Sequence, residues 1–480
     1  MSTTTSAPTH TEPAAATPAT PALLRWVPVA AFVVLLLALA RNAGLGISDP
    51  DTLWHVLAGD HLQRTWEFAG PDPLSDLTVH PFVLHQWLPD LGLSLANQLA
   101  GLAGVAWLAQ AARTALCVAL YLLCRRWAGP LPAALVAGLA VLGTADNLSP
   151  RPQLVGFVLL AVTVGAWLRT AEDQRVRWWL IPLSWLWGCS HGTWVVGTTV
   201  GAVVVAGLVL ERAVTWRRAA VMAVVPALSL ALAAATPLGL DLFRSMVWVR
   251  AVSPYIQEWR TPALDGASSA AALALAVLPA AVWLLRRRRV RWPHLLLYGL
   301  GLAWGLMSMR TVAVGVIIVA PLAAAALDAA LGRPLARADR AERRVVALGA
   351  AAALALSALL AASGPRSPVG VPDALSPRLA ALPAGTVVYN ADVLGGWLLW
   401  SHPDLVHVRD TRAELYGPEQ ARDYLDVMAA RPGWELAFDV HRPGAALVSE
   451  DLPVARALLT RGWAAAGRDH GYLLLLPPAG

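Results

Sequence analysis

Residues 47–88 read ISDPDTLWHVLAGDHLQRTWEFAGPDPLSDLTVHPFVLHQWL and form the only long polar segment between the first two hydrophobic spans. The segment is acidic, although the chain as a whole has a net charge of +6. Ser48 or Asp49 can cap a helix here, the following proline suits its first position, and Asp51 falls in its first turn. Asp51 and His55 then share one face of the helix. We expect this helix to lie flat at a membrane surface, presenting carboxylates and an imidazole.

The composition indicates a polytopic membrane protein. Hydrophobic residues make up 57% of the 480 residues and charged residues only 14%, whereas about a quarter of a soluble protein is charged. All basic residues are arginine, and we interpret the positive charge through membrane topology, with no nucleic-acid partner. The three cysteines have neither a disulfide nor a zinc-type spacing.

Hydrophobic segments close to the ~20 residues that a bilayer requires recur along the chain. We predict about eleven transmembrane helices, the first an uncleaved anchor that follows a disordered cytoplasmic tail at 1–25. An interfacial helix is expected at 87–100. The predicted spans are 26–46, 102–123, 131–148, 152–168, 178–191, 193–210, 219–236, 268–285, 293–309, 311–330 and 345–363.

The arginines predict the orientation of these spans. With a cytoplasmic N-terminus, the cytoplasmic loops are rich in arginine, including the run Arg286–Arg289, and the alternate loops are poor in it. The protein is then a multi-pass plasma (inner) membrane protein with a transmembrane domain at 26–363 and a first external loop at 47–88. An odd number of spans places residues 366–480 outside the cytoplasm, where we predict a small α/β domain. Its expected strands are 386–389, 405–408, 445–448 and 472–476, and its expected helices are 418–430 and 452–460.

Asp49 and Asp51 are the leading candidates for a catalytic site. Two carboxylates at this spacing could serve as a general base and as ligands of a divalent metal such as Mg²⁺ or Mn²⁺. The alternative is purely structural: Asp49 caps the helix and Asp51 favours its dipole. The membrane context favours the functional interpretation, because the acids cluster where a lipid-linked substrate would arrive.

Other polar residues lie on the same predicted side of the membrane. Arg151 could face a phosphate or simply extend from a helix end. His191, between two glycines in hydrophobic sequence, is either functional or bonded to a neighbouring carbonyl. Glu258 and Arg310 are a second acid and a second phosphate-binding arginine, or solvated loop charges. His85 is a further candidate substrate contact.

These motifs resemble those of bacterial GT-C glycosyltransferases over nearly the whole chain. The resemblance is more distant to protein mannosyltransferases, aminoarabinose transferases and oligosaccharyltransferases. It rests on short motifs in the external segments and the C-terminal region. They are Asp49-Pro50-Asp51-Thr52-Leu53-Trp54-His55, Arg151-Pro152, Trp187 to Gly192, Thr236-Pro237-x-Gly239, Glu258-Trp259, Arg310, Tyr389-Asn390-Ala391-Asp392, Gly395-Gly396-Trp397, Asp410-x-Arg412 and Leu415-Tyr416-Gly417.

The resemblance implies a GT-C-like fold and an enzyme that transfers a sugar from a polyprenyl-phosphate carrier to a glycan, lipid or protein acceptor outside the cytoplasm. It places a catalytic acid at Asp49 or Asp51. Many relatives carry Asp-Glu where this chain has Asp-Pro-Asp, which leaves open which acid is the base and whether a metal takes part.

We predict an inverting transfer in which Asp51, favoured over Asp49, takes a proton from the acceptor hydroxyl. Arg151 and Arg310 would stabilise the departing lipid phosphate, and His55 or His191 could orient the donor. Two other classes of function remain open. One is a transporter or flippase of lipid-linked glycans, and the other is a non-catalytic membrane scaffold of the cell envelope.

Overall fold

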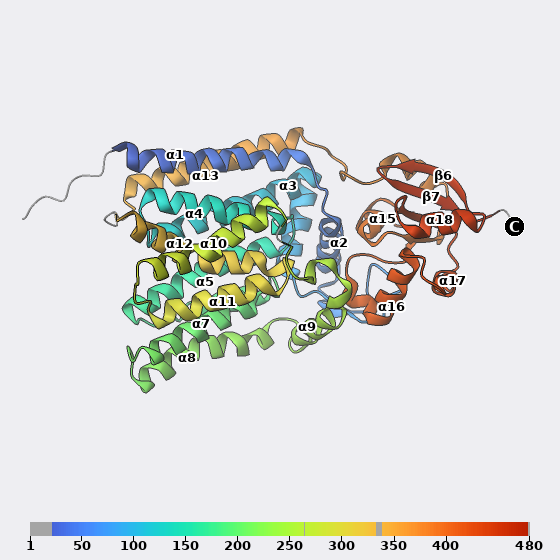
Figure 1. The fold of residues 1–480 in the computed structure, drawn as a ribbon. Helices are drawn as coiled ribbons and strands as arrows, with labels where there is room; N and C mark the ends of the chain where they lie inside the picture. The colour runs from blue at the N-terminus through green and yellow to red at the C-terminus, as the bar shows by residue number, and fades with distance from the viewer. Residues whose placement is uncertain (1–21, 264, 333–337, 479–480) are drawn as a thin grey trace, which may run out of the picture.

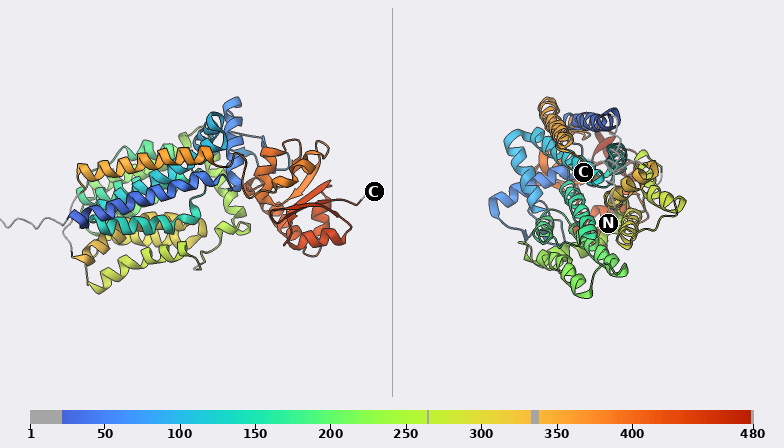
Figure 2. Two further views of the ribbon diagram at one scale, coloured as in Figure 1. Left: turned by 90° about the horizontal axis from the view of Figure 1, so that it is seen from above. Right: turned by 90° about the vertical axis from the view of Figure 1, so that its left-hand side faces the viewer.

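A computed structural model describes residues 22–263, 265–332 and 338–478. A long helical bundle carries a smaller α/β domain at one end (Figure 1). Two further views show the bundle helices running roughly side by side along the long axis of the molecule (Figure 2). The tail predicted to be disordered lies, for residues 1–21, outside the described residues, and the first helix begins at Ala22 rather than at residue 26.

Each predicted span coincides with a helix. Seven helices are long and apolar enough to cross a membrane, and two shorter apolar helices accompany them among the described residues. Helix α6 has only nine residues, too few to cross a bilayer at a rise of 1.5 Å per residue. The total of eleven crossings therefore stays a prediction. The bundle helices are α1 (Ala22–Ala40), α3 (Trp87–Arg125), α4 (Pro130–Gly143), α5 (Gln153–Asp173), α6 (Leu180–Gly188), α7 (Trp194–Leu210), α8 (Trp216–Ala231), α10 (Ala267–Leu285), α11 (Trp292–Met307), α12 (Val312–Leu331) and α13 (Arg340–Ser363).

Small residues allow the bundle helices to pack closely. A Cβ atom added at Gly315 of α12 would lie 2.5 Å from the backbone oxygen of Gly301 on α11. Because there is no side chain at these glycines, the two helix backbones can touch. Such close packing is typical of helices in a lipid bilayer, where the hydrophobic effect does not drive helix association. Helix α12 is accordingly enclosed by its neighbours, and 78% of the residues in its most apolar stretch are buried.

Two shorter helices lie at the end of the bundle that faces the α/β domain. They are α2 (Pro50–Thr65) and α9 (Asp241–Val252), and α2 runs across the bundle direction (Figure 1). Helix α3 contains a break at Ala100 and Gly101, where Gly101 adopts a left-handed φ of +61°. This break separates the predicted interfacial segment from the membrane-spanning part of α3. A two-stranded ribbon of β1 (Ala69–Gly70) and β2 (Phe82–Val83) follows α2.

The C-terminal domain is built on a five-stranded mixed sheet with the order β4-β3-β5-β7-β6. Strands β3, β4 and β5 are parallel, and β7 is antiparallel to both β5 and β6. The fold is thus a polytopic helical membrane protein with a small C-terminal α/β domain, as predicted. The strands are β3 (Val387–Asn390), β4 (Val406–His407), β5 (Ala445–Ser449), β6 (Ala464–Asp469) and β7 (Tyr472–Leu476).

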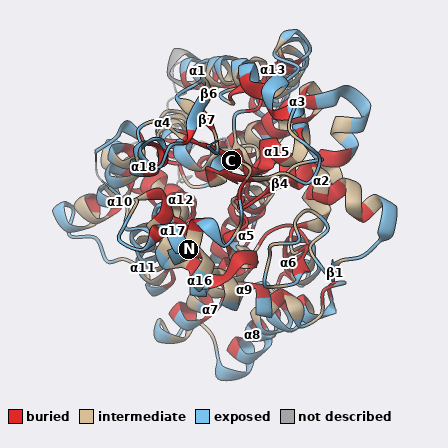
Figure 3. Cartoon of the chain, turned by 90° about the vertical axis from the view of Figure 1, so that its right-hand side faces the viewer, coloured by how far each residue is buried: buried red, intermediate tan, exposed pale blue. Residues whose placement is uncertain are grey.

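Short helices cover this sheet, and Figure 3 views the whole molecule from the domain end, with buried residues toward the centre and exposed residues at the periphery. The predicted helix at 418–430 is part of a longer element that begins at Ala413, because a left-handed Gly417 joins an additional turn to it. The helices are α14 (Ser376–Ala380), α15 (Gly395–Ser401), α16 (Ala413–Met428), α17 (Trp434–Asp439) and α18 (Pro453–Thr460).

Candidate active site

The start of helix α2 places the two leading candidate acids. Asp49 is the N-cap, and its Oδ1 accepts hydrogen bonds from the backbone amides of Asp51 (3.0 Å) and Thr52 (3.2 Å). The prediction that Asp49 caps the helix is therefore confirmed. The Thr52 hydroxyl also donates to the carbonyl of Pro150 at 3.0 Å, which ties the helix start to the loop before α5.

Arg151 brings both acids into one ion-pair network. Its Nε lies 2.8 Å from Asp49 Oδ2, and its Nη1 lies 2.8 Å from Asp51 Oδ2 and 3.0 Å from Glu258 Oε1. Burial lowers the pKa of Arg151, but the three carboxylates outweigh burial and raise it above its ordinary value. Arg151 is thus a permanent cation that organises the carboxylates.

Glu258 extends the network to Arg310. Glu258 lies in the 3₁₀ turn Gln257–Trp259, and Arg310 lies in the 3₁₀ turn Met309–Thr311, which precedes α12. Arg310 Nη1 is 2.9 Å from Glu258 Oε2. Burial opposes ionisation of Glu258, yet Arg310 and Arg151 hold its pKa below the ordinary range. Among the described residues only Nη1 of Arg310 has a side-chain partner, so its other donors are available to a ligand.

Asp51 differs from Asp49 in having one oxygen to spare. Asp51 Oδ1 is buried and has no hydrogen-bond partner among the described residues, whereas both oxygens of Asp49 accept from Arg151. Burial raises the pKa of Asp51 above its ordinary value of 3.8, opposed by the guanidinium of Arg151. A carboxylate with a raised pKa and a free oxygen is suited to accepting a proton.

His55 lies one turn further along α2 and pairs with an acid that the sequence did not indicate. Its Nδ1 is 2.7 Å from Asp90 Oδ1, and both side chains are buried. A distance this short requires one proton between the two atoms. Burial lowers the pKa of His55 to about 3, so its ring is neutral at physiological pH. An acid in the first turn of an otherwise apolar helix was the signal that could have identified Asp90.

The other two candidate histidines, His85 and His191, are not bonded to the ion-pair network. His85 Nδ1 lies 3.2 Å from the carbonyl of Val83, and its Nε2 lies 3.0 Å from the amide of Gln86. His191 is buried and lies 2.9 Å from the hydroxyl of Thr193. A role for either in substrate binding stays a prediction.

A small pocket adjoins the site. It has a volume of about 10 Å³, and its lining includes His85 with Asp90, the partner of His55, and Trp54. Arg412 and Glu414 of the C-terminal domain complete it. The first loop and the C-terminal domain therefore enclose this pocket together.

The C-terminal domain contacts helix α2 directly. Trp54 Nε1 on α2 donates to the Thr411 hydroxyl at 3.1 Å. The Thr411 hydroxyl is also near enough to Asp51 to lower its pKa by favouring the ionised carboxylate, although it forms no hydrogen bond with Asp51 Oδ1 in this structure. At the start of α15, a Cβ atom added at Gly396 would lie 2.4 Å from the backbone oxygen of Pro50. The glycine thus allows α15 to touch the first residue of α2.

Arg412 joins this domain to the first loop. Its Nη1 lies 2.7 Å from Asp72 Oδ1 and its Nη2 lies 2.6 Å from Asp410 Oδ2, with all three side chains almost completely buried. Tyr416 and His407 also bond Asp410 at 3.0 and 3.1 Å. Asp72 is therefore an anchor between the 47–88 loop and the C-terminal domain.

The predicted metal site has few ligands. No group of three or more His, Cys, Asp or Glu side chains in the described part of the chain is arranged to hold a metal ion. The cation between Asp49 and Asp51 is the guanidinium of Arg151. This donor set does not fit a resident Mg²⁺ or Mn²⁺, and we assign no step to a metal.

Comparisons with known proteins identify the fold. No protein-family model and no curated protein matches the sequence. Among solved structures, the Archaeoglobus fulgidus oligosaccharyltransferase tethered with an acceptor peptide has a TM-score of 0.53 at 12% identity, covering 89% of this chain and 70% of its own. ArnT from Cupriavidus metallidurans in the apo state has a TM-score of 0.50 at 15% identity, covering 94% and 97%. The arabinofuranosyltransferase AftD from Mycobacteria has a TM-score of 0.50 at 16% identity, covering 94% of this chain and 40% of its own.

These neighbours are all GT-C glycosyltransferases. The chain therefore has the GT-C fold that its motifs predicted, and it is a multi-pass membrane protein. At such low identity the similarity concerns the fold, and activity must be argued from the site.

Proposed function

We propose that the protein is an inverting glycosyltransferase that uses a polyprenyl-phosphate-linked sugar and acts on a hydroxyl of a glycan, lipid or protein acceptor. The main support for this proposal is the environment of the two carboxylate oxygens of Asp51. One of its oxygens is fixed by Arg151 and the other is buried and unpartnered among the described residues, at the helix end where the GT-C motif places an acid. The GT-C fold of its neighbours supports transfer of a lipid-linked sugar in general.

The proposed chemistry is a single displacement. Asp51 Oδ1 takes the proton of the acceptor hydroxyl as that oxygen attacks the anomeric carbon. The bond from the anomeric carbon to the phosphate oxygen breaks on the opposite face, and its electron pair leaves with the polyprenyl phosphate. Configuration at the anomeric carbon is inverted.

The two arginines have different parts in this proposal. Arg151 is engaged by three carboxylates and fixes the orientation of Asp51. In the part of the chain that the structure describes, Glu258 is the only side-chain partner of Arg310, so further donors remain available, which favours Arg310 as the group that stabilises the departing phosphate. This refines the prediction that both arginines bind the phosphate.

Transfer in proteoliposomes tests this function. The purified full chain would be reconstituted and supplied with a panel of radiolabelled polyprenyl-phosphate sugars and a membrane extract as acceptor. We expect label to move to the acceptor with inversion, which NMR of the product would establish. Label that crosses the bilayer still attached to its carrier would instead identify a flippase and contradict the proposal.

A further inference from the structure

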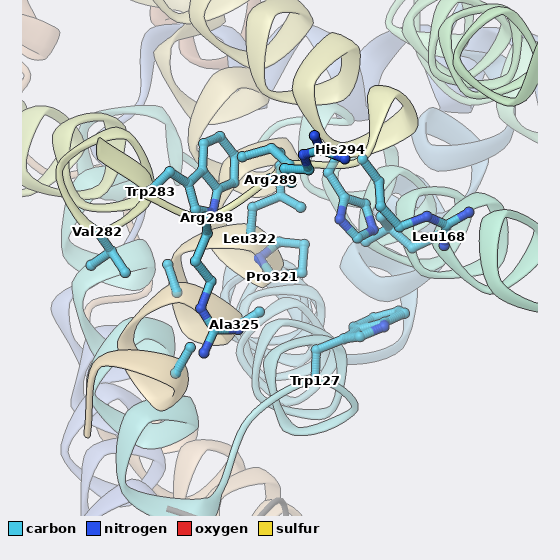
Figure 4. A pocket seen from close by; sticks show the side chains of 14 residues that line it. Trp127, Leu168, Val282, Trp283, Arg288, Arg289, His294, Pro321, Leu322 and Ala325 are labelled. Atoms are coloured by element: carbon cyan, nitrogen blue, oxygen red, sulfur yellow. The ribbon is translucent and has the colours of Figure 1, made fainter. Parts of the chain in front are cut away.

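A second hollow, shown close up in Figure 4, is lined mainly by the end of α10, the linker to α11 and helix α12, and shares no lining residue with the candidate active site. Its volume is about 190 Å³, room for roughly six water molecules. Its floor is apolar and comes from α12, mainly Pro321, Leu322 and Ala325. Two tryptophans, Trp127 after α3 and Trp283 on α10, stand at its sides.

The rim of this hollow is cationic because of how helix α10 ends. Arg287 adopts a left-handed φ of 46°, and the amides of Arg287 and Arg288 donate to the carbonyls of Leu284 (3.1 Å) and Trp283 (3.0 Å). This is the Schellman ending, whose left-handed position is usually glycine. Its geometry turns the chain so that Arg288 and Arg289 line the hollow.

The side chains of Arg288 and Arg289 lack partners among the described residues, unlike those of Arg286 and Arg291. Arg291 is paired with Glu211 at 2.9 Å, and Arg286 donates to the carbonyl of Ala330 at 2.8 Å. Among the described residues Arg288 and Arg289 have no side-chain hydrogen bond or ion pair, and both are exposed. The hollow therefore presents two free guanidinium groups above an apolar floor.

The surroundings indicate a lipid rather than a soluble anion. Leu284 and Leu285, just before the rim, are 77% and 83% exposed, as expected for side chains that face acyl chains. Tryptophans at this level are typical of the membrane interface. Basic pockets between transmembrane helices bind the headgroups of anionic lipids.

We propose that this hollow binds the phosphate of an anionic glycerophospholipid, with Arg288 and Arg289 holding the headgroup and the α12 floor accepting the upper acyl chain. Guanidinium groups form strong charge-assisted hydrogen bonds with phosphate. The inference is independent of the glycosyl-transfer proposal, because it uses none of the residues of the candidate active site.

Lipid retention tests the site. The full chain would be purified in detergent, incubated with radiolabelled phosphatidylglycerol, and passed over a column to measure lipid kept per protein. The variant R288Q/R289Q removes the two free cations. The matched control R343Q/R344Q removes two exposed arginines from α13 with the same change in net charge.

We expect wild type and R343Q/R344Q to retain the lipid equally, and R288Q/R289Q to retain it roughly tenfold less. Phosphatidylcholine should be retained weakly, and inorganic phosphate should not displace phosphatidylglycerol. Equal losses in both double variants would show diffuse charge attraction and overturn the site. Equal retention of phosphatidylcholine, or displacement by inorganic phosphate, would overturn the choice of an anionic lipid.

Discussion

At the scale of single residues, the contacts of Asp49 and Asp51 determine which of the two is the better candidate for the general base. Asp49 is saturated by two backbone amides and by the guanidinium of Arg151. Asp51 shares that guanidinium, but its buried Oδ1 has no hydrogen-bond partner among the residues that the structure describes. Our proposal divides capping and catalysis, which the sequence offered as alternatives, between neighbouring acids: Asp49 caps the helix, and Asp51 is the proposed proton acceptor.

The titration of Asp51 predicts how turnover depends on pH. Because burial raises its pKa above 3.8, the base is protonated and inactive below that raised value and ionised above it. We expect kcat/KM to fall as pH decreases through this pKa. His55, with a pKa of about 3, should add no step near its ordinary value of 6.5.

Profiles of kcat/KM against pH for wild type and His55→Gln check this prediction. Both should show the same acid limb, with His55→Gln changing only the plateau. An acid limb in wild type that disappears in His55→Gln would assign the titrating base to the imidazole and contradict the assignment to Asp51.

At the scale of elements, the loop after β4 contacts the 47–88 loop, including its helix α2. Arg412 is 1% exposed and bridges Asp72 and Asp410, neither of which has any exposed side-chain surface. Removing one partner of a buried ion pair leaves an uncompensated charge and costs about 3–5 kcal/mol. We expect Arg412→Gln to lower the apparent melting temperature in detergent markedly and to reduce turnover.

Arg461→Gln is the control for this prediction. Arg461 also pairs with an acid of the same domain, Asp439, at 2.9 Å, but that pair is exposed, and exposed pairs contribute at most about 1 kcal/mol. Equal effects of the two substitutions on the melting temperature would show that burial of the Arg412 pair is unimportant for attaching the domain.

At the scale of the whole molecule, the bundle separates an acidic end from an arginine-rich end. Helix α2 and the C-terminal domain lie at one end, and the linker between α10 and α11 lies at the other (Figure 1). The positive-inside rule predicts that the arginine-rich end is cytoplasmic. The catalytic proposal requires this orientation, because the acceptor is expected outside the cytoplasm.

Cysteine labelling in intact cells tests the orientation. The native Cys117, Cys124 and Cys189 are buried, so background reaction should be low. We expect Asp76→Cys, on the exposed surface of the first loop, to react with an impermeant maleimide from outside. Arg289→Cys should react only after the cells are opened, and the reverse pattern would contradict the predicted topology.

The sequence predicted the elements well and the contacts poorly. Hydrophobic spans, the Asp49 cap and four of the five strands of the C-terminal sheet follow from local patterns. Strand β6 was missed because its sequence, AAAGRD, is poor in residues that favour strands. It forms through pairing with β7 across a tight turn at His470 and Gly471.

The candidate site shows the same limit. Asp49, Asp51, Arg151, Glu258 and Arg310 were all candidates, and the structure joins them in one network. Their ranking could not be predicted, since it depends on which carboxylate oxygen stays free after folding. The contributions of Asp90, Thr411 and Arg412 depend on contacts between segments far apart in the chain, which no local pattern encodes.

Comparison of Asp51→Asn with Asp76→Asn in the transfer assay tests the central claim most directly. Asp76 lies on the same loop, is exposed, and has no side-chain partner among the described residues. Because general-base catalysis contributes about 10²–10⁴-fold, we expect Asp51→Asn to lose turnover by that order while keeping its melting temperature and donor binding. Asp76→Asn should match wild type. Wild-type turnover in a folded Asp51→Asn protein would contradict the proposal that Asp51 is the general base.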